Sequence, residues 1–88
     1  MNPKYSIIIP AYNAEKTIEN TINSVINQSY DNWEIVVVEN GSIDFTNSVV
    51  GKFLNDKRIS LIHSKKGVSF ARNKGIENST GEWILFLD

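Results

Sequence analysis

The stretch of sequence that decides the fold is Ser6-Ile7-Ile8-Ile9-Pro10-Ala11-Tyr12-Asn13. Its three consecutive isoleucines are β-branched, and such an uninterrupted apolar run is typical of a strand buried on both faces in a parallel sheet. Pro10 has no N–H for a sheet ladder, so we expect the strand to end there. The next residues should cross the carboxyl edge of the sheet, where open α/β folds bind their ligands.

The rest of the chain alternates strand-like apolar runs with segments that carry apolar residues on one helical face. Asn13 is the expected N-cap of the first helix, and Ser42 or Asp44 that of the second. This alternation predicts an α/β fold with a parallel sheet and right-handed crossovers, in a single domain over residues 1–88. The expected strands are 6–10, 33–38, 59–63 and 83–87, and the expected helices are 14–27, 43–55 and 68–79.

The charge, cysteine content and apolar runs of the chain exclude several classes of function. The formal net charge of −1 argues against nucleic-acid binding, which usually shows as a strongly basic face. The chain has no cysteine, which excludes disulfides and thiolate metal sites. Its longest apolar runs span about five residues, against about 20 for a membrane-spanning helix, and the N-terminus lacks the apolar core of a signal peptide. We therefore expect a cytoplasmic protein.

The predicted carboxyl edge gathers an aromatic ring, amides, acids and a basic turn, a set that suits a nucleotide. Each residue also has a plainer interpretation. Tyr12 could simply cover the end of the sheet, Glu39 and Asn40 could shape a turn, and the lysines and arginines could form a solvated face. His63 is expected to be an ordinary strand-end residue. The glycine-rich signatures of dinucleotide sites and P-loops, and the nucleophile elbow, do not occur.

Five motifs in order are more specific than these single residues. Together they resemble the N-terminal half of family 2 glycosyltransferases, which have the GT-A fold, and the resemblance covers essentially the whole chain. The motifs are Ser6-Ile-Ile-Ile-Pro-Ala-Tyr-Asn13, Ser24-Val-Ile-Asn-Gln-Ser-Tyr30, Trp33-Glu-Ile-Val-Val-Val-Glu-Asn-Gly-Ser42 with Asp44, Gly67-Val-Ser-Phe-Ala-Arg-Asn-Lys-Gly75 and Gly81-Glu-Trp-Ile-Leu-Phe-Leu-Asp88.

The resemblance implies a Rossmann-like sheet of strand order 3-2-1-4, with sugar transfer from a nucleotide-diphosphate sugar, usually a UDP-sugar, to an acceptor hydroxyl. It also implies cell-envelope polysaccharide synthesis in the cytoplasm or at the inner face of the membrane. Family members use Mn²⁺ or Mg²⁺, held through a D-x-D motif, to neutralise the diphosphate leaving group. Asp88 matches the first aspartate of that motif. The implied donor contacts are Pro10, Ala11, Tyr12, Glu39, Asn40, Ser42 and Arg72.

Two departures from the family pattern limit what this chain is expected to do alone. Asn40 replaces the second acid of the usual Asp-Asp-Gly-Ser, the group expected to accept the uracil N3–H. Its amide could still accept there through oxygen and donate through nitrogen. The catalytic base, the rest of D-x-D and the acceptor-binding half are expected beyond residue 88. The chain should therefore hold the donor-binding half only, bind no metal by itself and not catalyse transfer.

Two alternatives remain beside the glycosyltransferase interpretation. A module of the same fold could bind nucleotide without transfer, and a flavodoxin-like domain could merely mimic the motifs. The strand over 83–87 should also leave an open apolar edge, and such edges favour self-association, so we expect a tendency to form homodimers.

Overall fold

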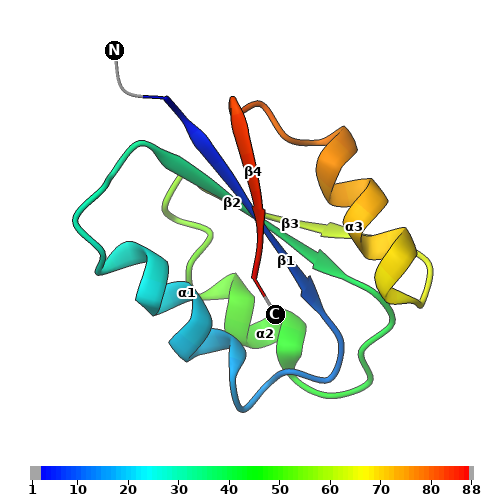
Figure 1. The fold of residues 1–88 in the computed structure, drawn as a ribbon. Helices are drawn as coiled ribbons and strands as arrows, with labels where there is room; N and C mark the ends of the chain where they lie inside the picture. Colours follow the sequence, from blue (N-terminus) through cyan, green and yellow to red (C-terminus); the bar gives the residue numbers. More distant parts are fainter. Residues whose placement is uncertain (1–2, 88) are drawn as a thin grey trace.

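The computed structural model describes residues 3–87 and has an α/β architecture (Figure 1). Strands and helices alternate along the chain, as the sequence predicts. In chain order the elements are β1 Tyr5–Ala11, α1 Ile18–Ile26, β2 Trp33–Glu39, α2 Thr46–Gly51, β3 Ile59–His63, α3 Val68–Glu77 and β4 Trp83–Phe86.

The four strands form one parallel sheet in the order β3-β2-β1-β4, which confirms the predicted order. Helices α1 and α2 lie on one face of the sheet and α3 lies on the other (Figure 1). No helix within residues 3–87 is both long and apolar enough to cross a bilayer.

The run of isoleucines in β1 serves both faces because successive side chains of a strand point to opposite sides. Ile7 and Ile9 pack with apolar residues of α1 and with Val50 of α2. Ile8, between them, packs with Ala71 of α3. All three isoleucines are buried, as expected for a central parallel strand.

Contrary to the prediction, β1 does not stop at Pro10 but continues to Ala11, and Pro10 is paired with Val38. The carbonyl of Ile8 accepts from Leu87 on the β4 side, whereas that of Ala11 accepts from Asn40 on the β2 side. Because alternate residues of a parallel strand face alternate neighbours, the nitrogen of Pro10 faces β4. Pairing with β4 has already ended at Ile8, so no N–H is needed there.

The helices are shorter than predicted. Helix α1 begins at Ile18 instead of residue 14, after a turn in which the N–H of Ile18 already donates to Ala14 O. Asn13 is not its N-cap; it has a positive φ of 49° and its side chain bonds elsewhere. Helix α2 covers only Thr46–Gly51, because tighter i→i+3 bonds replace helical ones beyond it.

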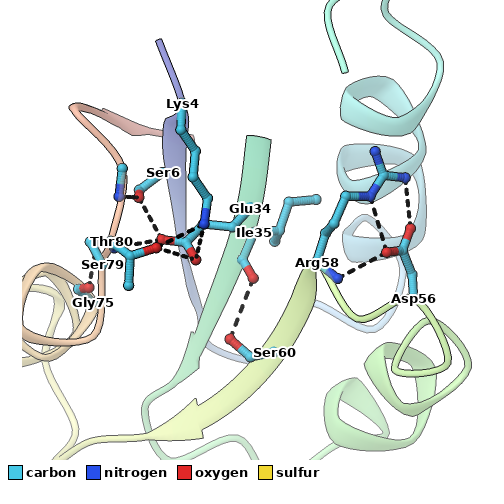
Figure 2. A network of polar contacts seen from close by, with 11 residues as sticks. Lys4, Ser6, Glu34, Ile35, Asp56, Arg58, Ser60, Gly75, Ser79 and Thr80 are labelled. Atoms are coloured by element: carbon cyan, nitrogen blue, oxygen red, sulfur yellow. Dashed lines mark hydrogen bonds and ion pairs between the residues drawn. The ribbon is translucent and has the colours of Figure 1, made fainter. Parts of the chain in front are cut away.

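A polar network fastens the segment before β4 to the first two strands (Figure 2). The Glu34 carboxylate accepts from Ser6 Oγ at 2.6 Å, from the Thr80 N–H at 2.7 Å, and pairs with Lys4 Nζ at 3.5 Å. Ser6 Oγ in turn accepts from the N–H of Gly81 at 2.8 Å. Burial alone would raise the pKa of Glu34, but these hydrogen bonds outweigh it and hold the pKa below its ordinary value.

Strand β4 forms an open edge of the sheet. Its four residues, Trp83 to Phe86, are all apolar and 39–59% exposed. Proline and ionised side chains commonly protect natural edge strands, and neither occurs within Trp83–Phe86. Self-association through this edge stays a prediction.

Gly75 lets α3 approach β1. A Cβ at this position would overlap Ile8 Cγ2 and lie 3.1 Å from Ile8 Cγ1, whereas a Cβ at Gly51 in α2 would meet nothing within 4 Å. We expect Gly75→Ala to destabilise the chain by about 1–3 kcal/mol through overpacking, despite the better helix propensity of alanine. Gly51→Ala should instead stabilise it by about 0.5–1 kcal/mol. Urea unfolding followed by circular dichroism measures both, and equal effects would contradict the close approach.

The Glu34 network predicts a pH dependence of stability. Because the folded pKa of Glu34 is lowered, its contribution is complete above the unfolded pKa of about 4.3 and is lost as pH falls through the folded value. Glu34→Gln should lower the free energy of unfolding by about 1–2 kcal/mol at pH 7. The difference from the unmodified chain should shrink below about pH 4. Glu77→Gln removes an exposed carboxylate of α3 and is the control for the lost charge. If the difference in stability between Glu34→Gln and the unmodified chain stayed constant with pH, the role assigned to Glu34 would be contradicted.

Candidate functional site

A hollow of about 390 Å³ opens at the carboxyl edge of the sheet. It lies where β1, β2 and the start of α3 meet, the position at which open α/β sheets bind ligands. Its lining residues come from the end of β1, the turn after β2 and the turn into α3: Pro10, Tyr12, Asn40, Lys66, Gly67 and Val68.

A larger hollow of about 530 Å³ lies elsewhere, between the open β4 edge and α1. Apolar and aromatic side chains such as Tyr5, Trp33 and Leu85 dominate its lining, and no ionised side chain contributes to it. This hollow is the part of the sheet face next to β4 that α1 does not cover. The smaller hollow, with a cation, an amide and an aromatic ring, is the better candidate for recognising a polar ligand.

The loop after β1 is fastened to the loop after β2. The N–H of Asn13 donates to Ser42 Oγ at 2.8 Å, and Asn13 Oδ1 accepts from the N–H of Ile43 at 2.9 Å. One residue further on, the N–H of Ala14 donates to Thr46 Oγ1 at 2.7 Å. Two of these bonds use side chains that the sequence suggested as helix caps, those of Asn13 and Ser42. Together the three bonds fix the segment that carries Tyr12.

Asn40 joins three parts of the site and is only 5% exposed. Its backbone N–H and its side-chain Nδ2 both donate to Ala11 O, at 3.0 and 3.1 Å. Its Oδ1 accepts from the N–H of Gly67 at 3.3 Å. The orientation of the amide is therefore set by the protein, with the oxygen toward the start of α3.

Glu39 is buried beside the hollow but does not line it. Its carboxylate accepts from the N–H of Ser42 and lies 3.2 Å from His63 Nδ1. Burial would raise the pKa of Glu39, yet the hydrogen bonds from Ser42 and His63 outweigh it and keep the pKa below its ordinary value. This carboxylate therefore stabilises the turn, and no acidic side chain of residues 3–87 lines the hollow.

Lys66 covers the aromatic wall of the hollow. Its Nζ lies 4.8 Å from the centroid of the Tyr12 ring, within cation–π range. Gly41 has a φ of +101°, and a Cβ there would lie 3.5 Å from Lys66 Cβ. The lysine stem thus lies along the glycine turn after β2.

The structure brings three of the predicted site residues together in the hollow: Pro10, Tyr12 and Asn40. Three others, Ala11, Glu39 and Ser42, support its walls through the bonds described above. Arg72 does not line the hollow; its guanidinium lies 5.5 Å from the centroid of the Phe86 ring, on the β4 side. The donor contacts of all seven residues stay predictions.

The sequence placed the basic turn Ser64-Lys65-Lys66-Gly67 at this sheet edge and left open whether its lysines form only a solvated face. In the structure Lys66 and Gly67 line the hollow, together with Val68, which the sequence interpretation did not assign to the edge.

Residues 3–87 do not by themselves fit a metal ion, because no group of three or more histidine, cysteine, aspartate or glutamate side chains among them could hold one. The predicted metal ligand, Asp88, lies outside the described residues.

Curated relatives match almost the whole chain but extend well beyond it. The E. coli UDP-Glc:alpha-D-GlcNAc-diphosphoundecaprenol beta-1,3-glucosyltransferase WfgD is 45% identical over 94% of this chain and 33% of its own length. A Bacillus subtilis relative, TuaG, whose name assigns it to teichuronic acid biosynthesis, is 37% identical over 98% of this chain and 35% of its own. The chain thus spans about a third of the length of these relatives.

Solved structures show the same fold. The S. aureus TarS 1-349 structure in complex with UDP-GlcNAc has a TM-score of 0.89 and 33% identity over 97% of this chain and 26% of its own. The mannosyltransferase PcManGT of Pyrobaculum calidifontis, in complex with GDP-Man and Mn²⁺, has a TM-score of 0.86 and 27% identity over 96% of this chain and 26% of its own. Both are GT-A transferases.

The family model described as glycosyl transferase family 2 matches residues 6–88, which is nearly the whole chain. The match begins at the strand that places Pro10 and Tyr12 and includes every element of the sheet. This chain belongs to glycosyl transferase family 2.

Proposed function

We propose that this chain is the donor-binding part of a glycosyltransferase, and that the hollow at the carboxyl edge holds the nucleoside of a nucleotide-diphosphate sugar. The observation that carries the proposal is the convergence of an aromatic ring, an oriented amide and a cation in one hollow, from Tyr12, Asn40 and Lys66. The reaction is transfer of the sugar to an acceptor hydroxyl.

UDP-sugars are the proposed donors. Two relatives support this choice, since TarS was solved with UDP-GlcNAc and the WfgD name specifies UDP-Glc. In this chain the Tyr12 ring offers a stacking surface and is 41% exposed. Among residues 3–87 no acidic side chain lines the hollow, which suits an anionic ligand.

A divalent cation is proposed to accompany the donor diphosphate in the transfer reaction. The Mn²⁺ in the PcManGT complex supports this for a relative. In this chain the one residue proposed to contribute is Asp88, since residues 3–87 offer no cluster of ligands. When bound, such a cation would neutralise charge on the leaving diphosphate.

The acceptor is proposed to belong to cell-envelope polysaccharide synthesis, and the reaction to occur in the cytoplasm or at the inner face of the membrane. The teichuronic acid and diphosphoundecaprenol named for two relatives support this assignment.

A second candidate function is nucleotide binding without transfer. It is favoured by Asn40, which replaces the second acid of the pattern expected after the second strand and whose amide is already bonded to Ala11 and Gly67. Release of UDP from a UDP-sugar by a longer protein that also contains the expected catalytic half separates the two candidates, because binding alone liberates no UDP.

The proposed nucleoside site predicts where UDP perturbs the chain. Titrating UDP with Mg²⁺ into ¹⁵N-labelled protein should shift the amides of Tyr12, residues 40–42 and residues 67–68 in two-dimensional NMR. Because base–aromatic stacking contributes about 1–3 kcal/mol, Tyr12→Ala should weaken UDP binding by about fivefold or more.

Phe70→Ala is the matched control. Like Tyr12, Phe70 is an exposed aromatic residue, but it lies on α3 and does not line this hollow. It should leave the UDP affinity unchanged. Silence of the folded, unmodified chain at millimolar UDP, or an equal loss in both variants, would contradict the proposed site.

A further inference from the structure

Lys66 is held in the hollow without a protein anion beside it. Its ammonium lies 4.8 Å from the centroid of the Tyr12 ring, and within residues 3–87 no carboxylate forms an ion pair with it. Its stem lies along Gly41, where a Cβ would be in van der Waals contact with it, 3.5 Å from Lys66 Cβ. The strongest hydrogen-bond donor of the hollow is therefore available to a ligand that binds beside Tyr12.

Asn40 supplies the matching acceptor. Its Nδ2 group is directed at Ala11 O and its Oδ1 at the N–H of Gly67, so the amide cannot turn over without losing both bonds. An amide oxygen carries two lone pairs, and Gly67 uses one of them. The hollow thus presents one oriented acceptor, Asn40 Oδ1, and one cationic donor, Lys66 Nζ.

Resting on the proposed function, we propose that Lys66 determines base specificity: its ammonium donates to a carbonyl oxygen of the base that stacks on Tyr12, while Asn40 Oδ1 accepts the adjacent ring N–H. Uracil has this pattern, because its N3–H lies between two carbonyl groups. Cytosine has the opposite pattern at this edge. Its ring nitrogen N3 carries no hydrogen to donate to Asn40 Oδ1, and the neighbouring exocyclic group is an amine instead of a carbonyl. The hollow therefore selects uracil over cytosine through the pair of Lys66 and Asn40.

The neighbouring lysine provides a matched control. Lys65 Nζ also lies near an aromatic ring, 5.6 Å from the centroid of Phe70, but it lines a different hollow with His63 and Lys74. Lys65→Met and Lys66→Met therefore remove the same charge one residue apart. Only the second removes the donor at the proposed base site.

The test uses uridine, cytidine and UDP, titrated by amide NMR into the unmodified 88-residue chain and the variants. Nucleosides without phosphate separate a contact to the base from attraction to the diphosphate. Lys66→Met should weaken uridine and UDP by the same factor, about five- to tenfold, and should reduce the preference for uridine over cytidine to the part that Asn40 supplies. Lys66→Arg, which keeps a donor, should restore most of that preference, and Lys65→Met should leave uridine binding unchanged.

Loss of UDP affinity without loss of uridine affinity would place Lys66 on the phosphates and overturn the inference. Equal weakening of uridine by Lys65→Met and Lys66→Met would do the same, because the effect would then be general electrostatics. If the unmodified chain binds uridine and UDP but Lys66→Met changes neither, the inference fails and the proposed function stands. If the folded, unmodified chain binds neither uridine nor UDP, the inference and the proposed function fail together.

Discussion

Parallel pairing of β1 with strands on both sides is the constraint on which the rest of the structure depends. The register sets Ala11 opposite Glu39, so the chain leaves β1 and β2 at the same level of the sheet. Asn40 then donates to Ala11 O, and Tyr12 lies beside it at the mouth of the hollow. A shift of one residue would exchange the buried faces of β1 and take Ile8 away from Gly75, the position in α3 that has room for its side chain.

The loops at this edge are stabilised by one another. Side chains of Asn13, Asn40 and Ser42 bond backbone groups of a different loop or element, and each such bond contributes about 1 kcal/mol. Glu39 is held in its turn by Ser42 and His63, which keeps its negative charge away from the lining of the hollow. A preformed hollow that is lined by a cation, and by no acid of residues 3–87, has less to reorganise when an anionic nucleotide binds.

The sheet could be predicted from the sequence because continuous apolar runs alternating with helical patterns permit few arrangements. The exact ends of the strands and helices could not be predicted. Pro10 continues β1 because its nitrogen faces a side where pairing has ended, which depends on the length of β4. Asn13 was expected to cap α1, but a tertiary partner, Ile43, competes for its oxygen. The place of Lys66 over Tyr12 likewise depends on contacts between segments far apart in the chain, which helix and strand periodicity does not encode.

Amide hydrogen exchange tests most directly whether these cross-loop bonds preform the hollow. The N–H groups of Asn13, Ile43 and Gly67 lie outside the strands and helices, yet each donates to a side chain of another loop. In the ligand-free chain they should exchange at least about tenfold more slowly than in an unstructured peptide. Ser42→Ala should remove the protection of Asn13 and leave that of Gly67. Exchange of all three at unstructured rates would show that the edge is not preformed.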